Sequence, residues 1–100
     1  MQVRFFEEAL DEIEESRAWY RSRSESAEAA FLRELDHAIE MVASAPNRWP
    51  IHLRRTRRYV FPTFPYSLLY FTEDDVINIA AVAHQKRRPG YWRKRLRKPS

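Results

Sequence analysis

The last strand-like segment of the chain runs into a cluster of side chains that can bind anions and transfer protons. In AAVAHQKRRPGYWRKR (80–95), an apolar run ends at His84, cations follow, and a Pro-Gly pair precedes Tyr91 and Trp92. Histidine has the side chain whose ordinary pKa, about 6.5, lies nearest neutrality, and clustered cations favour negatively charged partners. The stretch therefore predicts a site for a polyanion where the last strand leaves the core.

A second group of cations stands at the start of an expected strand and consists of Arg54, Arg55, Arg57 and Arg58. Four arginines within five positions repel one another unless an anion lies among them, and the bidentate guanidinium group suits phosphate. We expect these side chains to contact phosphate or an acidic partner, with Lys86, Arg87 and Arg88 closing the other side of the site. The alternative is an ordinary solvated strand.

The charges are divided between the halves of the chain. Residues 1–45 hold five arginines and eleven acidic residues, whereas residues 46–100 hold thirteen basic and three acidic residues, for a net charge of +4. Such a division gives a dipolar surface if the halves occupy different faces. The basic half is the expected contact region for nucleic acid or for an acidic partner segment.

The composition excludes several kinds of site. A length of 100 residues with 44% hydrophobic residues fits one compact domain, expected to span residues 1–100. The absence of cysteine removes disulfides and thiolate metal sites and suits a cytoplasmic protein. The three histidines have no ligand spacing, and the single glycine, Gly90, rules out a Gly-rich phosphate loop. We expect no metal and no cofactor.

No segment of the sequence suits a membrane. The longest stretch without formal charge, Tyr59–Thr72, is too short to cross a bilayer and contains two prolines. Glu7 and Glu8 stand where a signal peptide would be apolar. We therefore expect a cytoplasmic protein without membrane contact.

Hydrophobic periodicity predicts a helical hairpin followed by strands. The expected helices are Glu7–Arg21 and Ala27–Ala43, separated by a break at Ser22–Ser26 that holds cap candidates. Apolar spacing in the first helix comes from Leu10, Ile13 and Tyr20, and the apolar stripe of the second comprises Phe31, Leu35, Ala38, Ile39 and Val42. The expected strands are Gln2–Phe5, Arg57–Phe61, Tyr66–Phe71 and Val76–Ala83, with a turn at Thr72–Asp75 and a final helical turn or two within Pro89–Arg97. The predicted fold class is α+β, an N-terminal helical hairpin packed on a small antiparallel β-sheet.

Alternation along the last strand predicts which of its faces meets the helices. Ile77, Ile79 and Ala81 form a fully apolar face, expected to carry the helices. Asn78 and His84 belong to the opposite face, which we expect to be half open.

Four segments, in this order, resemble the RelE/ParE superfamily of small bacterial toxins from type II toxin–antitoxin systems. They are EEALDEIEESRAWY (7–20), FPYSLLY (64–70), INIAAVAH (77–84) and RRPGYW (87–92). The resemblance covers nearly the whole chain and implies a helical hairpin on a small antiparallel sheet, as the periodicity does. It also implies a cognate antitoxin whose C-terminal segment, usually amphipathic and often acidic, wraps the toxin.

The resemblance implies two modes of action. RelE-like toxins are ribonucleases that enter the ribosomal A site and cut messenger RNA, whereas ParE-like toxins poison DNA gyrase and are not nucleases. Our first interpretation is ribosome-dependent mRNA cleavage without a metal, with His84, Tyr91 and Arg87 as catalytic residues. Tyr91 falls where RelE-like nucleases keep a tyrosine. The other predicted contacts with RNA or a partner are Arg54, Arg55, Arg57, Arg58, Lys86, Arg88, Trp92 and Arg93.

Two positions favour the alternative, a ParE-like poison of gyrase. RelE-like nucleases carry arginines at positions that fall here on Ser67 and roughly on Gln85. The alternative is that Arg87 or Arg88 substitutes for the second of these arginines with a shifted geometry. Loss of one phosphate-stabilising charge costs about 2.7–4 kcal/mol of transition-state binding. A third hypothesis is a non-toxic basic module that binds RNA or an acidic protein. The catalytic candidates also have a purely structural interpretation, with His84 a strand-end residue and Tyr91 and Trp92 a lid on the sheet.

Overall fold

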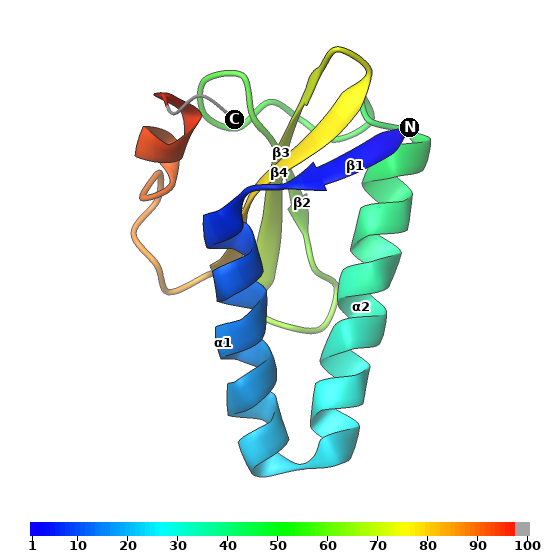
Figure 1. Ribbon diagram of the computed structural model, residues 1–100, viewed down its shortest axis with the longest axis vertical. Helices are drawn as coiled ribbons and strands as arrows, with labels where there is room; N and C mark the ends of the chain where they lie inside the picture. Colours follow the sequence, from blue (N-terminus) through cyan, green and yellow to red (C-terminus); the bar gives the residue numbers. More distant parts are fainter. Residues whose placement is uncertain (98–100) are drawn as a thin grey trace.

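The structure is a computed structural model that describes residues 1–97, with two helices on a four-stranded sheet (Figure 1). The elements, in chain order, are β1 (Gln2–Phe5), α1 (Glu7–Arg23), α2 (Glu25–Ser44), β2 (Arg57–Val60), β3 (Tyr66–Glu73), β4 (Val76–His84) and the 3₁₀ helix η1 (Arg93–Arg97). The α+β class and the helical hairpin are confirmed. Within residues 1–97, no helix is long and apolar enough to cross a membrane.

The two helices are separated by a single residue, Ser24. Its backbone N–H donates to the carbonyl of Tyr20 and ends α1, while its hydroxyl accepts a hydrogen bond from the N–H of Ala27 at 3.0 Å and caps α2. The break expected at Ser22–Ser26 is therefore correct in place but shorter than predicted. Because the connection is so short, α1 and α2 lie side by side and antiparallel (Figure 1).

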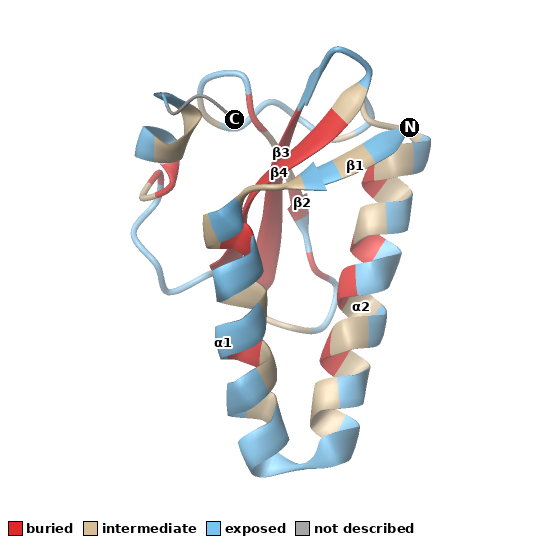
Figure 2. Ribbon diagram, in the orientation of Figure 1, coloured by how far each residue is buried: buried red, intermediate tan, exposed pale blue. Residues whose placement is uncertain are grey.

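The helices cover one face of the sheet with unequal amounts of apolar surface. The predicted stripe of α2 is confirmed, since Phe31, Leu35, Ala38 and Val42 are buried on the side facing the sheet (Figure 2). In α1 the spacing is only partly confirmed, because Leu10 is 47% exposed while other α1 residues pack against the core. Helix α1 is therefore mostly a solvated surface helix.

The sheet is mixed, and this corrects the antiparallel prediction. Its strand order is β1-β4-β3-β2, with β2, β3 and β4 antiparallel and β1 parallel to β4. Parallel neighbours need a long crossover connection, and here α1, α2 and the β2–β3 hairpin all lie between β1 and β4 in the sequence. Sequence patterns of single strands contain no information about this pairing direction.

The β3–β4 hairpin turns on two residues. Asp74 and Asp75 have φ values of 54° and 60°, as in the type I′ turns whose twist matches that of the flanking strands. The predicted turn at Thr72–Asp75 is therefore confirmed in place, and the strands extend further into it than expected.

A β-bulge interrupts the alternation of β4. Leu69 pairs with Ala81 and Tyr70 pairs with Ile79, so Ala80 is an extra residue on β4. One extra residue moves every following side chain to the other face of the sheet.

The bulge makes the predicted faces of β4 wrong beyond Ile79. Ala81 lies in a second apolar cluster with Trp92, away from the helices, whereas Val82 belongs to the core under the helices. The ring of His84 lies against that of Tyr66, a member of the same core. His84 therefore faces the helix side of the sheet and not the side opposite.

Gly90 lets the chain after β4 turn back over the sheet. Its φ of 77° lies in the left-handed region, and a Cβ there would lie 2.8 Å from the Nε of Arg93 and 3.2 Å from Leu53 Cδ1. The segment then ends in η1, a single 3₁₀ element where one or two helical turns were expected.

Candidate functional site

The four arginines near β2 do not converge on one site. Arg55 donates to Glu73 at 2.8 Å and its guanidinium lies 4.2 Å from the ring centroid of Phe71. Arg57 donates to the carbonyl of Trp49 at 2.6 Å. These two predicted contact residues therefore already form hydrogen bonds within the protein.

The other two arginines serve separate surfaces. Arg58 turns inward, where its Nε donates to the hydroxyl of Ser67 at 3.2 Å. Arg54, in the left-handed region with a φ of 55°, borders a depression that also contains residues of the C-terminal segment. The prediction of a single arginine-lined wall is not met.

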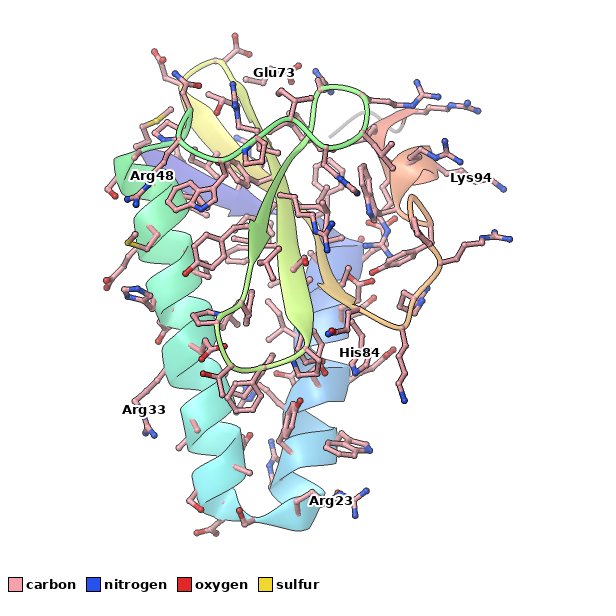
Figure 3. The ribbon with its side chains drawn as sticks, turned by 180° about the vertical axis from the view of Figure 1, so that it is seen from behind. Arg23, Arg33, Arg48, Glu73, His84 and Lys94 are labelled. Carbon is pink, nitrogen blue, oxygen red and sulfur yellow. The ribbon has the colours of Figure 1, made fainter. Side chains whose placement is uncertain are left out.

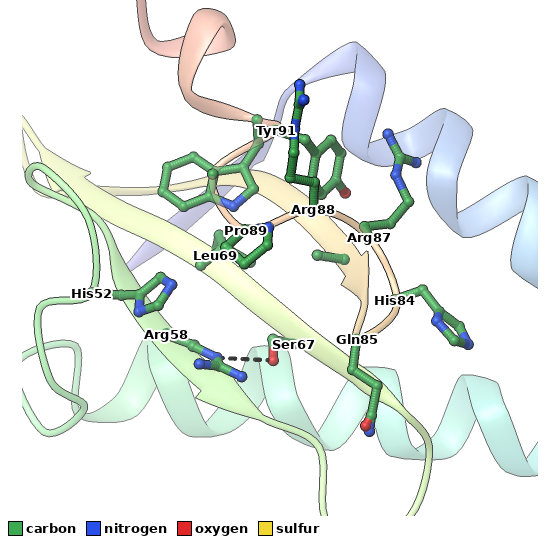
Figure 4. Close-up of a pocket in the computed structure, with 13 residues that line it drawn as sticks. His52, Arg58, Ser67, Leu69, His84, Gln85, Arg87, Arg88, Pro89 and Tyr91 are labelled. Carbon is green, nitrogen blue, oxygen red and sulfur yellow. Dashed lines mark hydrogen bonds between the residues drawn. The ribbon is translucent and has the colours of Figure 1, made fainter.

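A small pocket lies between the β2–β3 edge of the sheet and the segment after β4 (Figure 4). We call it the basic pocket; it has a volume of about 110 Å³ and is lined by His52, Arg58, Ser67, Leu69, Ala83, His84, Gln85, Arg87, Arg88, Pro89, Gly90, Tyr91 and Trp92. Three of these lining residues are arginines, and no acidic side chain lines the pocket. Its size and charge suit one phosphate or carboxylate group.

His52 borders this pocket although no sequence pattern distinguished it. Partial burial, and then the positive charge of Arg58, lower the pKa of His52 below its ordinary value of 6.5. The imidazole is therefore uncharged at neutral pH, and the positive charge of the pocket comes from its arginines.

His84 is turned away from Arg58, one of the arginines predicted to bind phosphate. Its Nδ1 accepts a hydrogen bond from the N–H of Lys86 at 3.1 Å, and its ring meets that of Tyr66 edge to face at 5.1 Å between centroids. Ser67, next to Tyr66 on β3, points to the other face of the sheet, toward Arg58. Figure 4 shows the imidazole directed away from the Arg58–Ser67 pair.

Tyr91 is held by a buried network that the sequence did not reveal. Its hydroxyl donates to Oε2 of Glu12 at 2.5 Å, and both oxygens of that carboxylate accept hydrogen bonds from the guanidinium of Arg95. Glu12 also accepts from the N–H of Val82 at 3.0 Å, and Arg95 donates to the carbonyl of Ala80 at 3.0 Å. We call these groups the Glu12 network.

The Glu12 network completes an edge of the sheet that the strands leave open. Strand β1 pairs only with Val76–Ile79, so among residues 1–97 the following part of β4 has a strand neighbour on one side alone. Side chains of α1 and η1 supply the missing hydrogen-bond partners there. Glu12 is one of six acidic residues between Glu7 and Glu15, and nothing in the sequence sets it apart.

Burial, and then the hydrogen bond to Glu12, raise the pKa of Tyr91 above its ordinary value of 10. The phenol therefore stays protonated at neutral pH and its proton is committed to a carboxylate. Two guanidinium groups lie against the ring of Tyr91. That of Arg87 is 3.8 Å from the ring centroid, and that of Arg95 is 5.1 Å from the same centroid.

The remaining predicted contact residues differ in exposure. Trp92 is only 2% exposed and packs with Leu69, Ala81 and Ala83, so its ring is part of a small core and is not offered to a partner. Lys86, Arg87, Arg88 and Arg93 are exposed. In the part of the chain that the structure describes, no group of three or more histidine and acidic side chains is arranged to hold a metal ion.

One family model matches most of the chain, and a solved structure shares its fold. The model of the ParE toxin of the type II toxin–antitoxin system parDE matches residues 3–89. Among solved structures, the chain is similar to one from the chromosomal ParDE TA system of P. aeruginosa, with a TM-score of 0.74 and 11% identity over 84% of this chain and 95% of that chain. At this identity the likeness shows the fold alone. The comparison with curated proteins found no match.

Proposed function

Because the chain belongs to the ParE toxin family of type II toxin–antitoxin systems, we propose that it inhibits growth by binding DNA gyrase and not by cutting RNA. Family membership makes the chain the toxin component of such a system and implies a cognate antitoxin as its partner. Gyrase is proposed as the target because ParE-like toxins act on it.

The observation that carries the non-nuclease proposal is the state of Tyr91. A general acid or base must reach the reacting oxygen with a proton it can give or take. The Tyr91 hydroxyl already donates to Glu12, and its raised pKa disfavours ionisation near pH 7. In this arrangement the residue fastens the C-terminal segment to α1.

The positions of the other nuclease candidates support the same proposal. His84 faces the helix side of the sheet, where it contacts Tyr66, whereas Arg58 faces the other side. Ser67 occupies one of the positions where RelE-like nucleases carry an arginine, and here its hydroxyl accepts a hydrogen bond from Arg58. His84 and Arg58 thus lie on opposite faces of the sheet, although His84 shares a cavity beside α1 with Lys86, Arg87 and Tyr91.

The basic pocket favours a second candidate function, the ribosome-dependent mRNA cleavage that the sequence first suggested. Arg58, Arg87 and Arg88 border a cavity that suits one phosphate group, and His84 lies at its rim. Binding of a phosphate there does not by itself supply proton transfer, so this candidate stands second.

Two assays separate the candidates. The purified toxin is added to gyrase, plasmid and ATP, and loss of supercoiling with trapped cleavage complexes is expected. The same preparation is added to translating ribosomes, where the messenger should stay intact across all codons. Codon-dependent cleavage of the messenger, together with unaltered supercoiling by gyrase, would refute the gyrase proposal.

Tyr91→Phe gives a sharper test, because it removes the hydroxyl and keeps the ring. We expect the variant to remain toxic and to lose about 1–3 kcal/mol of stability, since one buried hydrogen bond to a carboxylate disappears. If Tyr91 transferred protons, the variant would instead lose about two to four orders of magnitude in rate while still binding the antitoxin. Growth arrest after induction, scored beside antitoxin binding, distinguishes the two outcomes.

A further inference from the structure

The C-terminal segment and the loop before β2 bring five cations to one depression. Its volume is about 580 Å³, and it is lined by Arg54, Arg88, Pro89, Gly90, Tyr91, Arg93, Lys94 and Arg97, with no acidic residue. We propose that this C-terminal basic surface (Arg54, Arg88, Arg93, Lys94 and Arg97) binds the phosphate backbone of double-stranded DNA. The inference goes beyond the proposed action on gyrase, because the toxin should bind DNA in the absence of gyrase.

The cations of this surface are available to a ligand. All five are exposed, and within residues 1–97 none of them forms a salt bridge, in contrast to Arg17, Arg21, Arg55 and Arg95. Arg93 has an internal contact, a hydrogen bond from its Nε to the carbonyl of Gly90. Figure 3 shows Lys94 projecting away from the body of the fold.

The cations come from segments that are distant in the sequence. Arg54 belongs to the loop before β2, and the other four follow β4. Folding thus gathers like charges that repel one another. A counterion atmosphere offsets that repulsion in solution, and a polyanion with regularly spaced charges replaces the atmosphere with a gain in counterion entropy.

The lining favours a nucleic acid over a protein partner. Protein interfaces depend on a few large apolar or aromatic anchors that become buried, and this surface offers none that is free. Trp92 is buried, and the ring of Tyr91 is covered by Arg87 and Arg95. A phosphate backbone needs only the cations.

The same lack of free rings favours a duplex over a single strand. Proteins that bind single strands stack successive bases on aromatic side chains, and both faces of a duplex base pair are already stacked within the helix. Contacts with phosphate carry no sequence information, so binding of the backbone through these cations should be independent of DNA sequence.

The test is a titration of the full-length toxin against a labelled duplex of about 30 base pairs, followed by fluorescence anisotropy at several salt concentrations. With up to five phosphate contacts, a plot of log K, the association constant, against log[salt] should have a slope of about −4.5. This slope corresponds to a loss of affinity of about 500-fold between 50 and 200 mM salt. The DNA affinity of the variant Arg88→Ala/Lys94→Ala/Arg97→Ala should fall by only about 12-fold over that range. It should also bind more weakly at the lowest salt.

A matched variant, Arg4→Ala/Arg23→Ala/Arg33→Ala, loses the same charge from exposed sites on β1, α1 and α2. Figure 3 shows Arg23 and Arg33 on the helices, far from Lys94. The matched variant should keep the slope of log K against log[salt] that the unchanged protein shows. Equal slopes for the two triple variants, or tighter binding of single-stranded RNA of the same length, would overturn the proposal.

The outcome is separable from the proposed function. DNA binding through this surface with unaffected gyrase would leave the inference standing and remove the gyrase target. Trapped gyrase complexes without any affinity for bare DNA would do the reverse.

Discussion

Replacement of Glu12 by Ala is the most informative single change for the fold. The carboxylate joins α1 to the outer edge of β4 and to the C-terminal segment, with acceptors for Tyr91, Val82 and Arg95. Its side chain is 11% exposed and that of Arg95 is 14% exposed. Removal of Glu12 therefore leaves a guanidinium that is largely excluded from water and lacks its counter-charge.

The expected cost follows from that burial. Breaking a buried ion pair by removing one partner costs about 3–5 kcal/mol, because the remaining charge stays desolvated. Domains of this size are stable by about 5–15 kcal/mol in total. Glu12→Ala should therefore remove a large part of the free energy of unfolding, and trypsin should cut the segment after His84 faster than in the unchanged protein.

Urea unfolding followed by circular dichroism measures the effect. Glu15→Ala is the matched control, since Glu15 is an exposed carboxylate on the same helix, and it should change stability by less than about 0.5 kcal/mol. Arg95→Ala and the double variant complete a cycle, in which the double loss should be smaller than the sum of the single losses. Equal effects of Glu12→Ala and Glu15→Ala, or strict additivity in the cycle, would refute the reasoning.

Two further predictions concern pH and the β3–β4 turn. Burial, and then the neighbouring Tyr66, raise the pKa of Tyr20 from 10 to about 12, so its stabilising contribution is complete below about pH 10 and is lost as the pH rises through 12. Urea unfolding across this range should show a steeper loss for the unchanged protein than for Tyr20→Phe; titration of all tyrosines near pH 10 would contradict this. Asp75→Gly should raise stability by about 0.5–1 kcal/mol, because Gly meets no Cβ penalty at a φ of 60°. A lower urea midpoint for that variant would contradict the turn.

The elements that periodicity predicted well are those with one clearly buried face. The stripe of α2 recurs at helical spacing, and all but one of its members are buried. Helix α1 was predicted from weaker spacing, and there Leu10 proves to be exposed. Strands β3 and β4 end one or two residues later than predicted, because they pair with each other beyond their own patterns, whereas β2 ends one residue earlier.

The candidate site was predicted in composition and not in geometry. The residues around Arg87 and Arg88 do border a basic pocket, with Arg58 from the earlier cluster. Arg55 and Arg57 leave the group because Glu73 and the carbonyl of Trp49 accept their hydrogen bonds. A run of like charges indicates that cations are present, whereas their directions depend on acceptors that are distant in the sequence.

The sequence by itself determined the α+β class, the family likeness and the basic character of the C-terminal half, because each depends on local pattern or on counts of residues. Tertiary structure alone decided that β1 runs parallel to β4, that His84 faces the helices, and that Glu12 holds Tyr91 and Arg95. The reason is physical: a one-residue bulge at Ala80 reverses the faces of a strand. A buried carboxylate, likewise, is distinguished from its exposed neighbours only by the partners that folding brings to it.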